Sequence, residues 1–143
     1  SESLKMILDE EGLSHVWARH ATLARAVAAA FETWAQGGDI ELNVADPAFR
    51  APSVTAARIG AGGASRLRAW CEHEAGVTLG IGLGMANPGS PEMADFFRVA
   101  HMGHVNAHMT LGVLAVMEAG MQALEIPHAS GGVVAAAAVC AGR

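Results

Sequence analysis

The chain has 143 residues, of which 52% are hydrophobic and 16% are charged, and its formal net charge is −5. A chain of this length fits one folded domain, and this composition excludes an intrinsically disordered protein. The charge is negative and no block of basic residues is present. Neither nucleic acid nor an anionic membrane is therefore an expected partner, because both bind basic patches.

The cysteine content and the amino-terminal residues indicate the cellular compartment in which the protein is expected. Cys71 and Cys140 are too few for a disulfide framework, which predicts free thiols in a reducing compartment. A signal peptide is not visible, because Lys5 is soon followed by the acidic run Asp9–Glu11. We therefore expect a cytoplasmic protein. The chain starts at Ser1 rather than at a methionine, which suggests a fragment.

The first half of the chain predicts two helices followed by two strands. Residues 2–11 form a short helix that ends at Gly12. A second helix then runs to Gly37-Gly38, with apolar side chains spaced by three and four residues. Residues 40–44 alternate between apolar and acidic as in a half-exposed strand, and residues 53–59 are rich in the β-branched side chains that favour strands.

The second half predicts a helix, two strands and two further helices. Gly76 is the expected C-cap of the first of these helices. Asn106 is the expected N-cap of a long helix that reaches Glu125 and is apolar on nearly all sides. The other elements are strands at 77–83 and 96–101 and a terminal helix at 131–140. This order indicates an α+β two-layer sandwich, with a small, mainly antiparallel sheet and helices on one face.

The alternating glycines Gly80, Gly82 and Gly84 do not form a dinucleotide-binding fingerprint. The third glycine of that motif is missing, and so is the acidic residue that would bind the ribose. A glycine-rich strand and loop instead predicts a place where another backbone, or a ligand, approaches closely.

The histidines His101, His104 and His108 have a spacing that a metal site could use. His104 and His108 lie one turn apart if the helix has begun, but no cysteine lies near them in the sequence. We expect ordinary hydrogen-bonded histidines at a strand-to-helix turn and no metal site, with a zinc site as the open alternative.

Arg98 is the most informative charged residue because it lies in the middle of the apolar strand Phe96–Ala100. A guanidinium group there must find an anion or bear a large desolvation cost. It can pair with an acidic side chain of the same chain, or lie on a strand face open to water. A third possibility is that it binds a small carboxylate through two parallel hydrogen bonds.

Four segments, taken in register, resemble the small domain of the alanine–glyoxylate and serine–glyoxylate aminotransferases, which are class V enzymes dependent on pyridoxal phosphate. The segments are Glu11–Leu13 with Val16–His20, Pro52–Ala56, Gly80–Gly84 after a short strand at 77–79, and Phe97–Gly103 followed by Asn106. The tail Ala123–His128 fits as well, so the resemblance covers nearly the whole chain.

The resemblance implies roles for several residues. Arg98 matches the family arginine that binds the carboxylate of the substrate, a small amino acid or a 2-oxo acid such as glyoxylate or pyruvate. Pro52, Ser53, Gly82 and Gly84 would border the pocket. The family forms homodimers. The resemblance leaves the identity of the substrate open, because the segment between the glycines and the arginine strand is longer than usual.

The lysine content implies that the catalytic part of the enzyme lies elsewhere. A Schiff base with the cofactor needs a lysine, and the only one here is Lys5, outside the four segments. We therefore expect residues 1–143 to be the carboxy-terminal small domain alone, without the amino-terminal domain that binds pyridoxal phosphate. Such a chain would hold no catalytic residue, bind no cofactor and be inactive by itself. The alternative is a free-standing α+β module that binds a small acid without catalysis.

Overall fold

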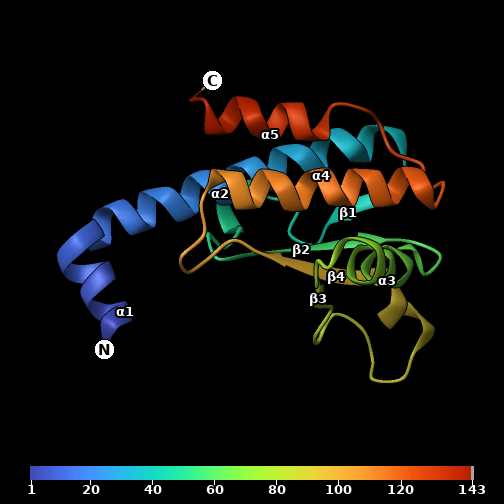
Figure 1. Cartoon of the computed structure of the whole chain (residues 1–143). Coiled ribbons are helices and arrows are strands. Elements are labelled where there is room, and N and C mark those ends of the chain that lie inside the picture. The colour runs from blue at the N-terminus through green and yellow to red at the C-terminus, as the bar shows by residue number, and fades with distance from the viewer. Residues whose placement is uncertain (143) are drawn as a thin grey trace.

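The computed structural model describes residues 1–142 and has a four-stranded sheet with helices gathered on one face (Figure 1). The strands follow the order β1-β2-β4-β3, and every neighbouring pair is antiparallel. Their bounds are Ile40–Leu42 (β1), Val54–Ile59 (β2), Gly80–Ile81 (β3) and Phe96–Ala100 (β4). The predicted α+β class with an antiparallel sheet is confirmed.

Residues 1–142 include five α-helices. They are α1 (Glu2–Lys5), α2 (Leu13–Trp34), α3 (Gly63–Ala75), α4 (Ala107–Ala123) and α5 (Gly132–Cys140). Helix α1 stands away from the sheet at the amino-terminal end of the molecule (Figure 1). Helices α2, α3 and α4 contact the sheet or one another, while α5 packs on α2 and α4 as an outer helix (Figure 1). On the far side of the sheet, Figure 1 shows the long connection between β3 and β4.

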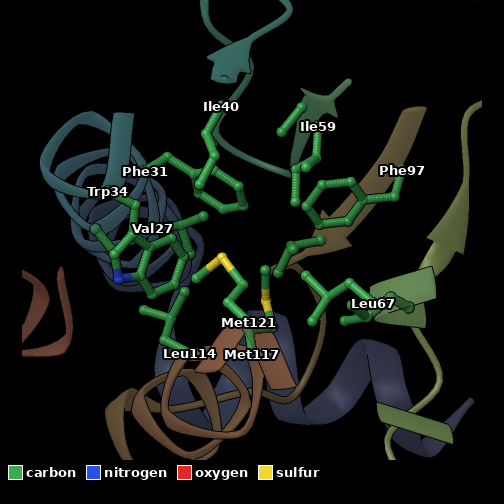
Figure 2. Close-up of a cluster of buried hydrophobic side chains, with 14 of the residues drawn as sticks. Val27, Phe31, Trp34, Ile40, Ile59, Leu67, Phe97, Leu114, Met117 and Met121 are labelled. Carbon is green, nitrogen blue, oxygen red and sulfur yellow. The ribbon is translucent and has the colours of Figure 1, made fainter. Parts of the chain in front are cut away.

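The core lies between the sheet and the helices and is built from aromatic, aliphatic and methionine side chains (Figure 2). Phe31 of α2 is central to it: its ring centroid lies 5.2 Å from that of Trp34 and 5.8 Å from that of Phe97. Met117 and Met121 of α4 close the core from the other side, as Figure 2 shows. Burial of these large side chains is the main stabilising contribution to the fold.

Alternation along β4 decides which of its side chains reach this core. Phe97 and Val99 are buried among the helices, whereas Arg98 between them is half-buried and Ala100 is exposed. Successive side chains of a strand point to opposite faces, so Arg98 lies on the face away from the core. The pairing register places Arg98 directly between Ala56 of β2 and Gly80 of β3.

Two of the expected helix caps are present. The side chain of Asn106 accepts a hydrogen bond from the backbone N–H of Met109, at 3.0 Å, and so caps α4. Gly76 ends α3 in the left-handed conformation, with φ +65°. Helix α4 differs from its prediction, because Leu114 and Met117 are buried but Met109 is exposed.

Two expected elements differ from their predictions: one strand is shorter, and one helix keeps its predicted range but changes its type within it. The strand expected at 77–83 is reduced to Gly80–Ile81, because Leu83 turns back to hydrogen-bond Ile81. The helix expected at 2–11 consists of α1 and one wide π-helical turn, Met6–Glu11, before Gly12 starts a new direction with φ +85°.

The remaining expectations concern thiols and membranes. Cys71 and Cys140 are both free, as predicted, and burial raises the pKa of the Cys71 thiol to about 11. None of the helices within residues 1–142 combines the length and the hydropathy needed to cross a bilayer.

Candidate functional site

Arg98 has only one hydrogen-bonding partner within residues 1–142. Its Nε–H donates to the backbone carbonyl of Ile81, with an N–O distance of 2.7 Å. It forms no ion pair with any residue of the described chain. A half-buried guanidinium in this state keeps two terminal NH₂ groups available for an anion.

The surroundings of Arg98 leave room for a small molecule. Its cross-strand neighbours, Ala56 and Gly80, are among the smallest residues. A cleft of about 310 Å³ opens beside it, with walls from β2, the segment 77–80, β4 and α4. The walls are largely apolar, so charged hydrogen bonds formed within the cleft would be less weakened by water than at an open surface.

A second arginine on the same face of the sheet, Arg58 of β2, is paired very differently. Its guanidinium lies 3.3 Å from Asp39, 4.0 Å from Glu41 and 3.4 Å from Asp95. Asp95 also accepts a hydrogen bond from the backbone N–H of Gly62, at 2.6 Å. Arg58 is thus neutralised within the chain and is not a candidate for binding an external anion.

The sequence-predicted pocket residues are not all beside Arg98. Pro52 borders a separate cleft of about 210 Å³, toward α2. Ser53 directly precedes Val54, which does line the Arg98 cleft. Gly82 is buried, and a side chain there would overlap Phe96, while Gly84 lies in open space with φ +71°. None of these four residues lines the Arg98 cleft, although Gly80 of the same glycine run does.

His101 joins the end of β4 to the segment that precedes β2. It is completely buried, and its Nδ1–H donates to the carbonyl of Pro52 at 3.1 Å. Its Nε2 then accepts from the Thr55 hydroxyl at 2.9 Å, and its backbone N–H bonds the carbonyl of Ser53 at 3.0 Å. Burial lowers the pKa of His101 below its ordinary value, so the ring is held neutral.

His104 and His108, in contrast, are exposed. Within residues 1–142 no group of three or more histidine, cysteine or acidic side chains is arranged to hold a metal ion. The bonded state of His101 is the ordinary hydrogen-bonded histidine that the sequence predicts.

Arg19 of α2 is a residue whose structural role the sequence did not reveal. It binds Glu11 through two parallel hydrogen bonds of 2.7 and 2.8 Å and donates to the carbonyls of Gly103 and Val105. Arg19 lowers the pKa of the Glu11 carboxyl through these hydrogen bonds. A cleft of about 420 Å³ lies beside this pair, but all three guanidinium nitrogens of Arg19 are already bonded within the chain.

The four sequence segments therefore meet at β4 and the turn after it. The first reaches Gly103 through Arg19, the second reaches His101 through its loop, and the third pairs with Arg98 through β3. Three segments that are distant in the sequence thus contact β4 or the turn that follows it.

Lys5 does not belong to this arrangement. It lies on α1, exposed, with its Nζ 3.3 Å from Glu10 and 3.8 Å from Glu2. It does not line the Arg98 cleft. The chain therefore offers no lysine at the site where an aldehyde cofactor would need to form a Schiff base. The residues that line this cleft therefore do not fit the Schiff-base part of a pyridoxal phosphate site.

The fold and the site together define an α+β domain that presents an unpaired arginine beside a small apolar cleft. No protein-family model matches the chain. Serine–glyoxylate aminotransferase from Arabidopsis thaliana is 30% identical to it over 136 residues, which are 92% of this chain and 30% of that protein. L-aspartate–glyoxylate aminotransferase from Paracoccus denitrificans is 31% identical over 128 residues, 89% of this chain and 30% of that protein.

Two solved structures show the same fold over most of the chain. Ureidoglycine–glyoxylate aminotransferase from Bacillus subtilis has a TM-score of 0.73 and 25% identity, over 91% of this chain and 32% of that one. Pyridoxamine–pyruvate aminotransferase from Mesorhizobium loti has a TM-score of 0.74 and 27% identity, over 90% and 31%. The chain is thus related in sequence and fold to class V aminotransferases, and it spans about 30% of the length of these relatives.

Proposed function

We propose that residues 1–143 are the carboxy-terminal small domain of a class V, pyridoxal-phosphate-dependent aminotransferase. The parent enzyme transfers an amino group between a small amino acid and a 2-oxo acid such as glyoxylate or pyruvate. The observation that carries this proposal is Arg98, a half-buried arginine without an acidic partner in residues 1–142, beside a cleft of about 310 Å³. The names of the four related proteins, each a glyoxylate or pyruvate aminotransferase, support the choice of substrate.

Arg98 would bind the substrate carboxylate. A guanidinium and a carboxylate can form two parallel, charge-assisted hydrogen bonds, which fix both the position and the direction of the ligand. A substrate held in this way is presented in one orientation, and such positioning contributes to the rate of a reaction that occurs at an adjacent group. The apolar walls formed by Val54, Leu79 and Val99 would exclude water from this ion pair.

The cofactor would be held by residues outside this chain. Pyridoxal phosphate supplies the electron sink in transamination, and the protein supplies its binding and orientation. The single lysine of this chain is exposed on α1, so the Schiff-base lysine and the phosphate site belong to another part of the parent enzyme in this proposal.

We further propose a homodimer in a reducing compartment such as the cytoplasm. The two free thiols support the compartment. Four large apolar side chains are exposed near the amino terminus, namely Leu4, Leu8, Leu13 and Trp17, and such a group is typical of a surface covered in a larger assembly. Light scattering of the full-length protein tests the dimer, and a monomer at micromolar concentration would contradict it.

The full-length gene product tests the central proposal. We expect it to carry a lysine-bearing domain, to show the absorbance of a bound pyridoxal phosphate aldimine, and to transaminate glyoxylate or pyruvate. The isolated 143 residues should show neither the aldimine absorbance nor transamination. A full-length product without such a domain would instead favour the free-standing acid-binding module, as would a cofactor-free protein that still binds pyruvate through Arg98.

A further inference from the structure

We propose that Gly80 and the backbone carbonyl of Ile81 are positioning groups that orient Arg98, so that it binds a carboxylate end-on through its two terminal NH₂ groups. The inference rests on the proposed function only in assigning a carboxylate ligand to Arg98. It adds which edge of the guanidinium is used and which residues determine it.

Gly80 has no side chain, and this leaves room for the side chain of Arg98 to extend beside it. The strand register places Gly80 directly opposite Arg98, on the same face of the sheet. A Cβ atom added to Gly80 would lie 3.3 Å from Cβ of Arg98 and 3.5 Å from its Nε. The arginine side chain therefore lies beside the glycine, where an added methyl group would be too close to Cβ of Arg98 and in contact with its Nε.

The carbonyl of Ile81 fixes the guanidinium at the end of this side chain. Its oxygen accepts the Nε–H of Arg98 at 2.7 Å, a distance typical of a charge-assisted hydrogen bond. The same oxygen accepts the backbone N–H of Leu83 at 3.0 Å. Both of its lone pairs are thus used, and the turn that includes Leu83 determines the direction in which the oxygen points.

Gly82, in the middle of this turn, holds the carbonyl in place. It is buried, and a Cβ atom on it would overlap the side chain of Phe96 on the neighbouring strand. The absence of a side chain lets the turn lie directly on β4. This close approach explains why β3 ends after two residues, at the position where its last carbonyl meets Arg98.

The hydrogen bond at Nε determines how a carboxylate can bind. A guanidinium offers a side-on edge, made of Nε–H and one terminal N–H, and an end-on edge, made of one N–H from each terminal nitrogen. Because Ile81 occupies Nε–H, the side-on edge is incomplete. The end-on edge has no partner within residues 1–142 and remains for the ligand.

Substitution of Gly80 by alanine in the full-length enzyme tests the inference. The added methyl group would crowd Cβ of Arg98 at 3.3 Å, so it should shift the arginine side chain by a few tenths of an ångström and raise the KM for the 2-oxo acid by about 3-fold or more, with kcat changed by less than about 2-fold. Cofactor absorbance should be unchanged. Gly112→Ala is the matched control, because Gly112 is exposed on α4 and an added methyl group would meet nothing within 4 Å, so its KM should stay at the unsubstituted value.

Exchange of the arginine Nε–H protons with water provides a measurement that needs no substitution. In full-length protein labelled with ¹⁵N-arginine, the Nε–H of Arg98 should exchange at least about 10-fold more slowly than that of exposed Arg25, whose only side-chain hydrogen bond within residues 1–142 is through Nη2. Equally fast exchange would overturn the inference, even if Gly80→Ala failed to fold.

The outcomes separate the inference from the proposed function. If Arg98→Ala loses activity while Gly80→Ala keeps the KM of the unsubstituted enzyme, the positioning role is wrong and the proposed function stands. If Arg98→Ala itself has normal kinetics, the proposed function fails. A loss of kcat with unchanged KM in Gly80→Ala would also contradict the positioning role.

Discussion

Arg58 and Arg98 lie on neighbouring strands and on the same face of the sheet, yet they are bonded in opposite ways. Arg58 has three carboxylates within 4.0 Å, from Asp39, Glu41 and Asp95. Arg98 has a single hydrogen bond, to a backbone carbonyl, and no ion pair in the described chain. Both arginines are half-buried, but the charge of Arg58 is compensated by nearby carboxylates and that of Arg98 is not compensated within the described chain.

The cross-strand neighbours account for part of the difference, and the carboxylates of Asp39 and Asp95, which lie outside the strands, account for the rest. Arg58 is paired with Glu41 on β1 and Phe96 on β4, so an acid and an aromatic ring lie beside it. Arg98 is paired with Ala56 and Gly80, which leave space and no charge. An arginine whose charge is compensated locally stabilises the sheet, whereas one without compensation is suited to an external anion.

The largest expected effect is the loss of activity on removing Arg98. In the full-length enzyme, Arg98→Ala should lower kcat/KM for the 2-oxo acid by about 100-fold or more, because a bidentate charged contact is lost. Steady-state kinetics with glyoxylate and pyruvate measure this. Arg25→Ala, which removes an exposed arginine whose side chain bonds only Thr22 among the described residues, is the control and should leave kcat/KM unchanged. A comparable loss in both variants would remove the distinction between Arg98 and an ordinary surface arginine.

Asp95 should matter for stability rather than for activity. Asp95→Ala removes an ion pair with Arg58 and leaves the N–H of Gly62 without its acceptor, so it should destabilise the chain by about 1–3 kcal/mol. Urea denaturation measures the change. Asp39→Ala is the matched variant, and its cost should stay below about 1 kcal/mol, because its carboxylate is 66% exposed and the ion pair is screened by water.

We expect His101 to make the stability of the chain depend on pH. Its pKa is lowered in the folded state, so the unfolded chain binds a proton more readily. The contribution to stability is therefore complete above the ordinary value of 6.5 and is lost as the pH falls through the lower folded pKa. The urea midpoint should decrease between about pH 7.5 and about pH 5.5.

His101→Asn separates this titration from the other histidines. The variant should lose about 1 kcal/mol or more at about pH 7.5, because two buried hydrogen bonds are altered, and it should show a flatter dependence on pH. His108→Asn, at an exposed position, should retain the original dependence. A slope unchanged in His101→Asn would assign the pH effect to another group.

The parts of the fold that depend on local signals could be predicted from the sequence. The capping side chain of Asn106 and the left-handed Gly76 act within one turn of their helices, so their residue types are informative. The length of β3 depends instead on Gly82 lying against Phe96, a contact that no local pattern contains. The same reason explains why Arg19, bonded to a carbonyl 84 residues away, looked like an ordinary surface arginine.

The sequence singles out Arg98 as a candidate for the site, but it does not identify the residues that surround it. Arg98 was recognisable because a charge in an apolar strand demands an anion. The neighbours of Arg98 can be identified only from the strand register. Gly80 lies opposite Arg98, whereas Pro52 and Ser53 form hydrogen bonds with His101, beyond the end of the strand. The resemblance pointed to Gly82 and Gly84 of the glycine run, whereas the register places Gly80 opposite the arginine.

The smallest expected effect is on stability, and it compares the two arginines directly. It concerns the contribution of the Arg98 side chain to the free energy of unfolding. Arg98→Gln removes the positive charge and keeps a polar side chain of intermediate length. Arg98→Gln alters one hydrogen bond, removes no ion pair within residues 1–142, and also removes a charge that has no acidic partner there, so the free energy of unfolding should change by no more than about 1 kcal/mol. The corresponding variant at the other arginine, Arg58→Gln, should cost more, since it leaves Asp95 without its cationic partner. Urea denaturation of the two variants under identical conditions ranks them. A larger loss for Arg98→Gln than for Arg58→Gln would show that Arg98 is held for the stability of the sheet, and it would reverse the roles assigned to the two arginines.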